Sequence, residues 1–384
     1  MVGACRRRRY RDVSDRPRER VRPAAEGQAA MNLIDRYIAR TIVAATGVVI
    51  LVIGALLSLM LFISEVDNIG DGSYGLLKIL AWVAMMLPAR LYLVLPVVAL
   101  LGSLLALGAL AAGSELVVIR SAGVSMKRLA ISVSFAGLAL AIVTVLLGEF
   151  VAPTGVSDAT QLRDKARHGE AKRSVDDGLW LRQQQWYLRI DSVLPGGRID
   201  GLYAYQLNDD GQLTESVKAR SAHTDGNQLI LDSPQITVLS PTKSQTETPE
   251  HLALPIKISP DVLELAVTQP DELSSSGLWR YIDYLDANDI DADDYRLALW
   301  RNIVTPFTVW ALVVFALPFA FGSLRSASAG QRLFVGGLIG LLFFLFNEIV
   351  ASTGPVYGIP PWFAASLPTV LLALGTGYWM RRLN

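Results

Sequence analysis

The chain has 384 residues, of which 52% are hydrophobic and only 18% are charged, and its 35 lysines and arginines balance its 35 acidic residues. A soluble domain of this size would carry about 25% charged residues. The mean hydropathy of +0.37 and the grouping of apolar residues into long blocks exclude three descriptions of the whole chain: a soluble enzyme, a disulfide-stabilised secreted scaffold and a nucleic-acid-binding protein. The single cysteine, Cys5, cannot form an internal disulfide.

Residues 1–30 contain nine arginines and four acidic residues but no apolar core, so they do not form a secretory signal. Two interpretations stay open for this segment. It is either a disordered basic tail near anionic headgroups or sequence translated upstream of a true start at Met31.

Six apolar windows each approach the roughly 20 residues that an α-helix needs to cross about 30 Å of hydrocarbon. The windows are Ile42–Ile63, Leu91–Ala112, Leu129–Gly148, Ile303–Phe321, Leu333–Val350 and Trp362–Met380. They predict an α-helical membrane protein with six transmembrane helices, grouped as residues 31–152 and 302–384.

A further apolar stretch, Leu76–Pro88, is too short to span the membrane and is interrupted by Pro88 and Arg90. Counting it as a seventh span would move every later loop to the opposite side of the membrane, against the distribution of lysine and arginine in those loops. We therefore interpret it as a kinked or interfacial lead-in to the second helix.

In the short loops and at the ends of the predicted membrane segments, lysines and arginines lie on one side of the membrane only. Loops 64–77 and 351–361 contain none, whereas the other side carries nine: Arg36, Arg40, Arg120, Lys127, Arg128, Arg325, Arg332, Arg381 and Arg382. By the positive-inside rule, both termini are cytoplasmic and the long segment 151–302 is outside.

The outside segment changes to short alternating runs between residues 153 and 270, separated by the turn dipeptides Gly196-Gly197, Asp210-Gly211 and Asp225-Gly226. The strand-like runs are Leu179–Leu181, Trp186–Ile190, Gly201–Tyr205 and Gln228–Leu231. This pattern predicts an antiparallel β jelly-roll-like domain inserted between helices 3 and 4. Residues 271–301 are expected to form connector helices, including an amphipathic one over 276–285.

Motifs for catalysis, metal binding and nucleotide binding are absent from the sequence. Gly-Lys never occurs, so no P-loop exists, and the three histidines are widely separated. The acidic run from Asp289 lacks the glycine and the final glutamate of a calcium loop. We expect no catalytic residues, no metal and no bound cofactor in this chain.

The short cytoplasmic segment 114–125 is amphipathic and begins with Ser114, a possible helix cap. It is either an ordinary surface loop or a docking helix for a cytoplasmic partner, which its lone carboxylate favours. The residues expected to dock are Glu115, Leu116, Ile119, Arg120 and Gly123, of which Gly123 would end the helix. Glu149 and Glu348, near the outer ends of their spans, are either functional intramembrane acids or merely solvated.

The chain resembles the LptF/LptG permease family over residues 31–384. Five stretches carry the match: Leu33–Ile38, Ser114–Val118 with Ser121–Gly123, Gly148–Pro153, Gly322–Arg325 and Val356–Pro361. They resemble the LptG branch more than the LptF branch. The resemblance implies a non-catalytic permease subunit, in the bacterial inner membrane, of an ABC transporter that extracts lipopolysaccharide and passes it to a periplasmic jelly-roll bridge.

The same resemblance implies an LptF-like permease as heterodimer partner, an LptB-like ATPase dimer that binds the ATP, and LptC-like and LptA-like jelly-roll proteins. It makes 114–125 the coupling helix, with Glu115 at the family's acidic position. Family members can carry lysines after the first helix, where this chain has the acidic stretch Ser64–Asp71. Arg90 or the partner is therefore expected to contact lipid phosphates.

Seven residues are candidates for the lipid path: Phe62, Arg90, Phe343 and Phe346 in the membrane part, and Trp186, Leu188 and Ile190 in the β-domain. Two other functions stay open, namely a membrane-embedded lipid-modifying enzyme and a mechanotransmitting ABC subunit that moves no lipid itself.

Overall fold

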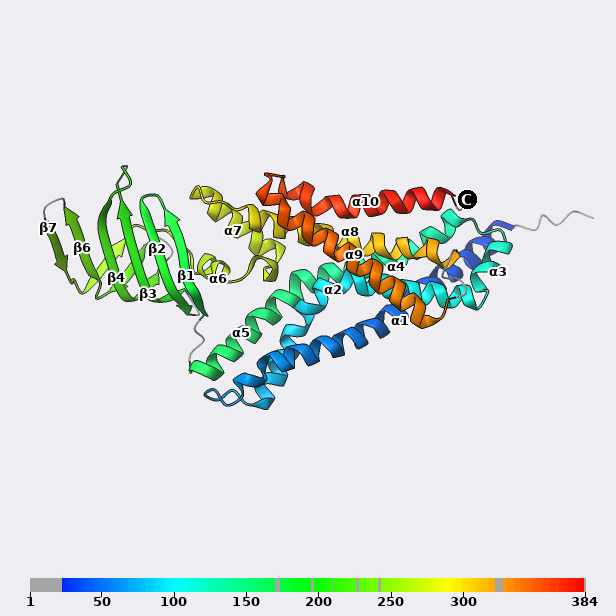
Figure 1. Ribbon diagram of the computed structural model, residues 1–384, viewed down its shortest axis with the longest axis horizontal. Helices are drawn as coiled ribbons and strands as arrows, with labels where there is room; N and C mark the ends of the chain where they lie inside the picture. The colour runs from blue at the N-terminus through cyan, green and yellow to red at the C-terminus, as the bar shows by residue number, and fades with distance from the viewer. Residues whose placement is uncertain are drawn as a thin grey trace, which may run out of the picture.

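The structure is a computed structural model of an elongated molecule, with a helical bundle at one end and a β-sheet at the other (Figure 1). It describes residues 23–169, 173–194, 197–208, 210–225, 228–240, 243–321 and 327–382. Residues 1–22, which hold most of the basic tail, and the motif Gly322–Arg325 lie outside this described part, as do Gly196 and Gly226 of two predicted turns.

The described residues include six helices that are long and apolar enough to cross a membrane, which confirms the predicted number. These spans are built on α1 (Pro23–Glu65), α2 (Leu76–Ala112), α4 (Met126–Leu146), α8 (Asp293–Phe321), α9 (Ala329–Val356) and α10 (Pro361–Arg382). Helix α2 runs unbroken through Pro88 and Pro96, so Leu76–Pro88 is the start of the second span and not a seventh one. Neighbouring helices can compensate for the missing proline hydrogen bonds within the bundle.

The bundle core lies between α2, α4 and α8, whereas α1 and α9 are peripheral. Of the most apolar window in each span, 67% is buried in α2 but only 17% in α1 and 11% in α9. Small residues let these outer helices approach α2 closely, as is usual in lipid. A Cβ added at Gly102 would lie 2.5 Å from Thr46 Cα, and one at Gly340 would lie 2.6 Å from Val97 Cγ1.

The third span continues beyond the predicted membrane segment. A π-helical turn (Leu147–Val151) joins α4 to α5 (Ala152–His168), so the β-domain begins about twenty residues later than the predicted boundary at residue 153. Val156 and Ala159 of α5 are buried against Trp82 of α2. The sequence did not predict α5, because most of its residues are polar and its apolar face is narrow.

The predicted antiparallel sheet between the third and fourth spans is confirmed. Its strands are β1 (Arg173–Gln183), β2 (Trp186–Leu194), β3 (Arg198–Leu207), β4 (Leu213–Thr224), β5 (Leu229–Asp232), β6 (Gln235–Ser240), β7 (Lys243–Glu247) and β8 (His251–Leu254). They follow the order β1-β2-β3-β4-β5-β8. The strand β4 pairs with β5 along one part of its length and with β6 along another, and β7 pairs with β6. One face is apolar, and Leu263 of the short helix α6 (Pro260–Ala266) packs in the same cluster.

The connector contains the 3-10 turn η3 (Pro270–Glu272) and α7 (Ser275–Ala287). Leu278, Tyr281 and Leu285 of α7 are buried at helical spacing, which confirms the predicted amphipathic helix. Burial raises the pKa of Tyr284, a neighbour of this buried face, to about 12.

Candidate coupling and lipid-contact sites

The helix α3 (Glu115–Ser121) projects from the end of the bundle farthest from the sheet (Figure 1). Ser114 adopts a left-handed conformation with φ of 61° and makes no side-chain cap, in contrast to the prediction. The helix ends at Ser121, and Gly123, just after the C-cap residue Ala122, stops it as predicted because its φ of +91° is a conformation that glycine adopts without strain.

Two of the five predicted docking residues face the protein's own bundle. Leu116 is fully buried in the core cluster, and Ile119 packs against that cluster. The apolar side chains that α3 presents outward are Val117 and Val118, which are 39% and 64% exposed. Leu116 and Ile119 therefore anchor the helix, while the adjacent valines form its free apolar surface.

The charged residues of α3 contact neighbouring helices. The Tyr37 hydroxyl of α1 donates a hydrogen bond of 2.8 Å to Glu115 Oε2. The Arg120 guanidinium lies 5.4 Å from the ring centroid of Phe321, at the end of α8. Glu115 and Arg120 nevertheless remain exposed, so both are available to a partner.

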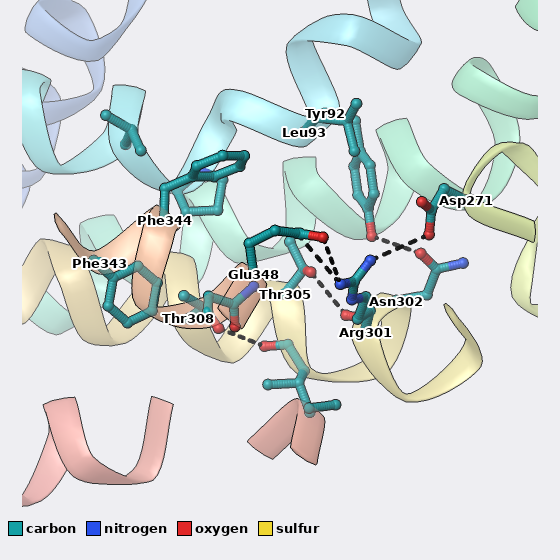
Figure 2. Close-up of a pocket in the computed structure, with 15 residues that line it drawn as sticks. Tyr92, Leu93, Asp271, Arg301, Asn302, Thr305, Thr308, Phe343, Phe344 and Glu348 are labelled. Carbon is teal, nitrogen blue, oxygen red and sulfur yellow. Dashed lines mark hydrogen bonds and ion pairs between the residues drawn. The ribbon is translucent and has the colours of Figure 1, made fainter. Parts of the chain in front are cut away.

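A cavity of about 110 Å³ lies between α2, α8 and α9 (Figure 2). Arg301 lies at one side, 3.5 Å from Asp271 and 3.3 Å from Glu348. Glu348 is thus half of an ion pair and not simply a solvated acid. Phe343 lines the apolar side of this cavity, whereas Phe346 is not among the lining residues and is 41% exposed.

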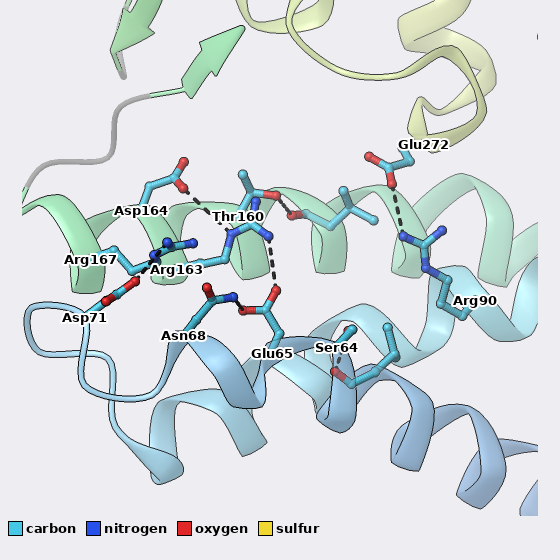
Figure 3. Close-up of polar contacts among 12 residues, drawn as sticks. Ser64, Glu65, Asn68, Asp71, Arg90, Thr160, Arg163, Asp164, Arg167 and Glu272 are labelled. Carbon is cyan, nitrogen blue, oxygen red and sulfur yellow. Dashed lines mark hydrogen bonds and ion pairs between the residues drawn. The ribbon is translucent and has the colours of Figure 1, made fainter. Parts of the chain in front are cut away.

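A second, wider cleft of about 920 Å³ separates α1, α2 and α5 from α6, η3 and α7 (Figure 3). Glu65 is buried at its base, where it lies 3.2 Å from Arg163 and accepts a hydrogen bond from Asn68. Arg167 lies 2.9 Å from Asp71. The acidic stretch after α1 is therefore matched by arginines of α5, which the sequence analysis missed because it placed them in the β-domain.

Arg90 lines the same cleft, and its guanidinium lies 3.7 Å from Glu272 (Figure 3). Phe62 does not line the cleft but packs partly buried beside it, and its neighbour Leu61 takes the lining position. Of the four membrane-part lipid candidates, Arg90 lies in the cleft and Phe343 in the other cavity.

Glu149 connects the membrane bundle to the connector. Its two carboxylate oxygens accept hydrogen bonds from the backbone N–H groups of Ser275 and Ser276, at 2.9 and 3.2 Å. These are the first residues of α7, whose free N–H groups attract a negative charge. Glu149 thus caps the N-terminus of α7, although it lies 126 residues before Ser275 in the chain.

In the β-domain, Leu188 and Ile190 are fully buried on the apolar face, and Trp186 packs at the margin of the same cluster. The sequence correctly placed these three side chains on one face of a strand. In this structure they form part of a packed core that α6 completes.

Residues 36–382 match the family described as lipopolysaccharide export system permease LptF/LptG. The chain belongs to the LptF/LptG permease family. It is 32% identical to the lipopolysaccharide export system permease protein LptG of Haemophilus influenzae over 343 residues, covering 89% of this chain and 96% of that protein. It is 31% identical to LptG of Escherichia coli K12 over 340 residues, covering 88% and 94% of the two chains.

Both of these LptF/LptG relatives carry the LptG name, which confirms the resemblance to that branch. Membership also agrees with a multi-pass chain that carries an antiparallel β-domain between its third and fourth spans. Most predicted site residues of this LptF/LptG member divide among three places, namely the α3 segment at one end, the two cavities of the bundle and the sheet at the other end, whereas Phe62 and Phe346 line neither cavity.

Proposed function

We propose that this chain is the permease subunit of an ABC transporter that extracts lipopolysaccharide from the inner membrane and passes it to a periplasmic β-jelly-roll bridge. The observation that carries this proposal is the placement of an exposed helix, α3, and a sheet with an apolar face at opposite ends of one six-span bundle (Figure 1). A subunit that couples a cytoplasmic ATPase to periplasmic transfer needs a docking surface at one end of the bundle and a lipid-binding domain at the other. The asymmetry of lysine and arginine puts α3 and both termini in the cytoplasm.

The cytoplasmic partner in this proposal is an LptB-like ATPase dimer, which binds the ATP and docks on α3. Exposed Glu115, Val117 and Val118 give α3 a mixed acidic and apolar surface that suits a groove with a basic residue. Leu116 holds the helix on the bundle, so a movement of the ATPase would be transmitted to the spans.

The membrane partner is an LptF-like permease, which would face α1 and α9. These spans are the least buried of the six, and large apolar side chains such as Leu51, Met60 and Phe346 are 73%, 68% and 41% exposed. Acyl chains between two such subunits would contact this surface, with Phe62 and Phe343 behind it.

Lipid phosphates would be held at the outer cleft. Arg90 is the candidate because its side chain is 41% exposed and its contact to Glu272 is long, so an incoming phosphate can replace that carboxylate. Acyl chains would then follow the apolar face that carries Trp186, Leu188 and Ile190, after displacement of α6. LptC-like and LptA-like proteins would receive the lipid.

The test is reconstitution of the chain with an LptF-like subunit and an LptB-like ATPase in proteoliposomes containing lipopolysaccharide. We expect ATP-dependent release of lipopolysaccharide to a soluble jelly-roll acceptor, and no release when the ATPase carries a defective P-loop. An assembled complex that hydrolyses ATP but transfers no lipopolysaccharide to the acceptor would overturn the proposal.

A further inference from the structure

The sheet has a second face, opposite the packed core, that the transport function does not use. Along β1 to β4, two cross-strand rows of side chains lie on this outer face. In strand order, the first row is Trp180, Arg189, Tyr203 and Lys218, and the second is Arg182, Tyr187, Tyr205 and Ser216. The rows are outward because the alternating neighbours Leu181, Leu188 and Ala204 belong to the buried cluster.

Rings and cations alternate along the first row, and the second row places one cation beside two tyrosines. Lys218 Nζ lies 5.3 Å, and Arg189 Cζ 5.7 Å, from the centroid of the Tyr203 ring, which is therefore flanked by two cations. Trp180 stacks on Tyr205 with centroids 6.3 Å apart and an interplanar angle of 22°. Arg182 lies 5.4 Å from the Tyr187 centroid.

Glycine in the strand makes room for one of the cations. Gly178 has φ of +75°, and a Cβ there would lie 2.7 Å from Arg189 Nε and 3.0 Å from its Cγ. The Arg189 side chain thus lies flat across the backbone of β1, with Asp191 3.7 Å from its guanidinium. Glycine inside a strand weakens the strand and usually marks a close approach.

The charge of the two rows is opposite to that of their surroundings. Segment 153–301 holds 15 lysines and arginines against 24 acidic residues, yet the eight row positions contain three cations and no acid. Trp180 is 56% exposed although the apolar core lies on the other face of the same strand. Burial in the apolar core does not account for this tryptophan, which stacks on Tyr205, and Asp191 lies beside only one of the three cations, Arg189.

We propose that this outer face binds the phosphorylated oligosaccharide of the lipid that the chain carries; the inference rests on the proposed function. The C–H face of a pyranose ring packs on an aromatic ring, and a phosphate on that sugar pairs with lysine or arginine. Neighbouring strands lie about 4.8 Å apart, so ring and cation alternate at about the width of one sugar. The site takes a phosphosugar, and the two faces of the sheet separate sugar from acyl chain.

The experiment uses the full-length chain in nanodiscs and, as probe, the core oligosaccharide of lipopolysaccharide with its acyl chains removed and its phosphates retained. Affinity is measured by isothermal titration at two salt concentrations. We expect Trp180→Ala and Lys218→Gln each to weaken binding about tenfold, the size of one desolvated cation–π or ion contact. The matched controls are Trp279→Ala, an exposed tryptophan on α7, and Lys243→Gln, an exposed lysine on β7 outside the two rows. Neither control should change the affinity.

A phosphatase-treated probe tests the role assigned to the cations. It should bind the original chain more weakly, and Lys218→Gln should then cause no further loss, whereas Trp180→Ala still should. Equal binding of treated and untreated probe, absence of binding, or equal affinities for all four variants would overturn the inference. Saturable binding of polyglutamate that outcompetes the oligosaccharide would overturn it in favour of an acidic protein partner.

Failure of this inference can be told apart from failure of the transport function, since the probe needs neither ATP nor partner subunits. Intact lipopolysaccharide release by Trp180→Ala and Lys218→Gln proteoliposomes, with oligosaccharide binding absent from the unaltered chain, would overturn this site alone. Oligosaccharide binding that follows the predicted variant pattern, in a chain that supports no release, would overturn the transport function and leave the sugar site supported.

Discussion

The hydroxyl of Tyr37 donates a hydrogen bond of 2.8 Å to the Glu115 carboxylate, joining the first span to the short helix α3 across 78 residues of sequence. Leu116, the next residue, is buried in the bundle, so this hydrogen bond adds a second attachment at the acidic end of the helix while leaving Glu115 exposed. The relationship makes α1 part of the proposed coupling surface.

We expect Glu115→Lys to abolish ATPase binding and lipopolysaccharide release, and Glu115→Gln to weaken both less. Truncating one member of a buried charged pair at an interface costs about 2–5 kcal/mol, because the partner charge is left unpaired. Pull-down of the ATPase and release from proteoliposomes measure the effect. Glu348→Gln, near the opposite end of the bundle, is the control. Normal ATPase binding by Glu115→Lys would refute the coupling role.

Tyr37→Phe keeps the ring and removes only the donor to Glu115. We expect weaker ATPase binding by about 0.5–1.5 kcal/mol, the net value of one hydrogen bond, because the carboxylate loses its orientation. In a Glu115→Gln background the same change should have a smaller effect. A double-mutant cycle on ATPase affinity measures this difference, and strict additivity would show that Tyr37 does not act through Glu115.

Single cysteines test the predicted topology in a Cys5→Ser background. Ser73, in the loop after the first span, and Ser352, in the last turns of α9, are exposed at one end of the bundle, whereas Ser121 is at the end of α3 at the other. In intact cells made permeable only at the outer membrane, an impermeant thiol reagent should label cysteine at 73 and 352 but not at 121. Labelling at 121 would place α3 outside and invalidate the orientation.

Gly102→Ala should destabilise the bundle, since its added methyl group would overlap Thr46 of α1. Overpacking of this kind costs about 1–3 kcal/mol and would lower the midpoint of thermal unfolding in detergent. Gly47→Ala is a matched control, because an added Cβ there would meet nothing within 4 Å. Equal midpoints for the two variants would mean that α1 and α2 do not pack as described.

Glu149→Ala should release the start of α7 from the third span. Loss of two charge-assisted hydrogen bonds to Ser275 and Ser276 is expected to cost about 1–3 kcal/mol of local stability. Hydrogen exchange should therefore speed up in the first turn of α7, with Glu149→Gln intermediate. Unchanged exchange in that turn would contradict the capping role.

The sequence alone determined the features that depend on local free energies. Transfer of about twenty apolar residues into lipid is favourable wherever the rest of the chain lies, so the six spans were readable, although the predicted second window began at Leu91 and α2 begins at Leu76. The alternation of apolar and polar residues likewise placed Leu188 and Ile190 on one face of β2, and Gly123 marked the end of α3.

Tertiary structure decided which surfaces meet, because a side chain's partner depends on segments that folding brings from far along the chain. Helix α5 is mostly polar, and Val156 is buried only where α2 supplies Trp82. Leu116 has the pattern of a docking residue, yet the bundle itself covers it. Glu149 and Glu348 looked alike as acids at span ends. One caps α7 and the other pairs with Arg301, since the backbone N–H groups and the guanidinium reach them only in the folded chain.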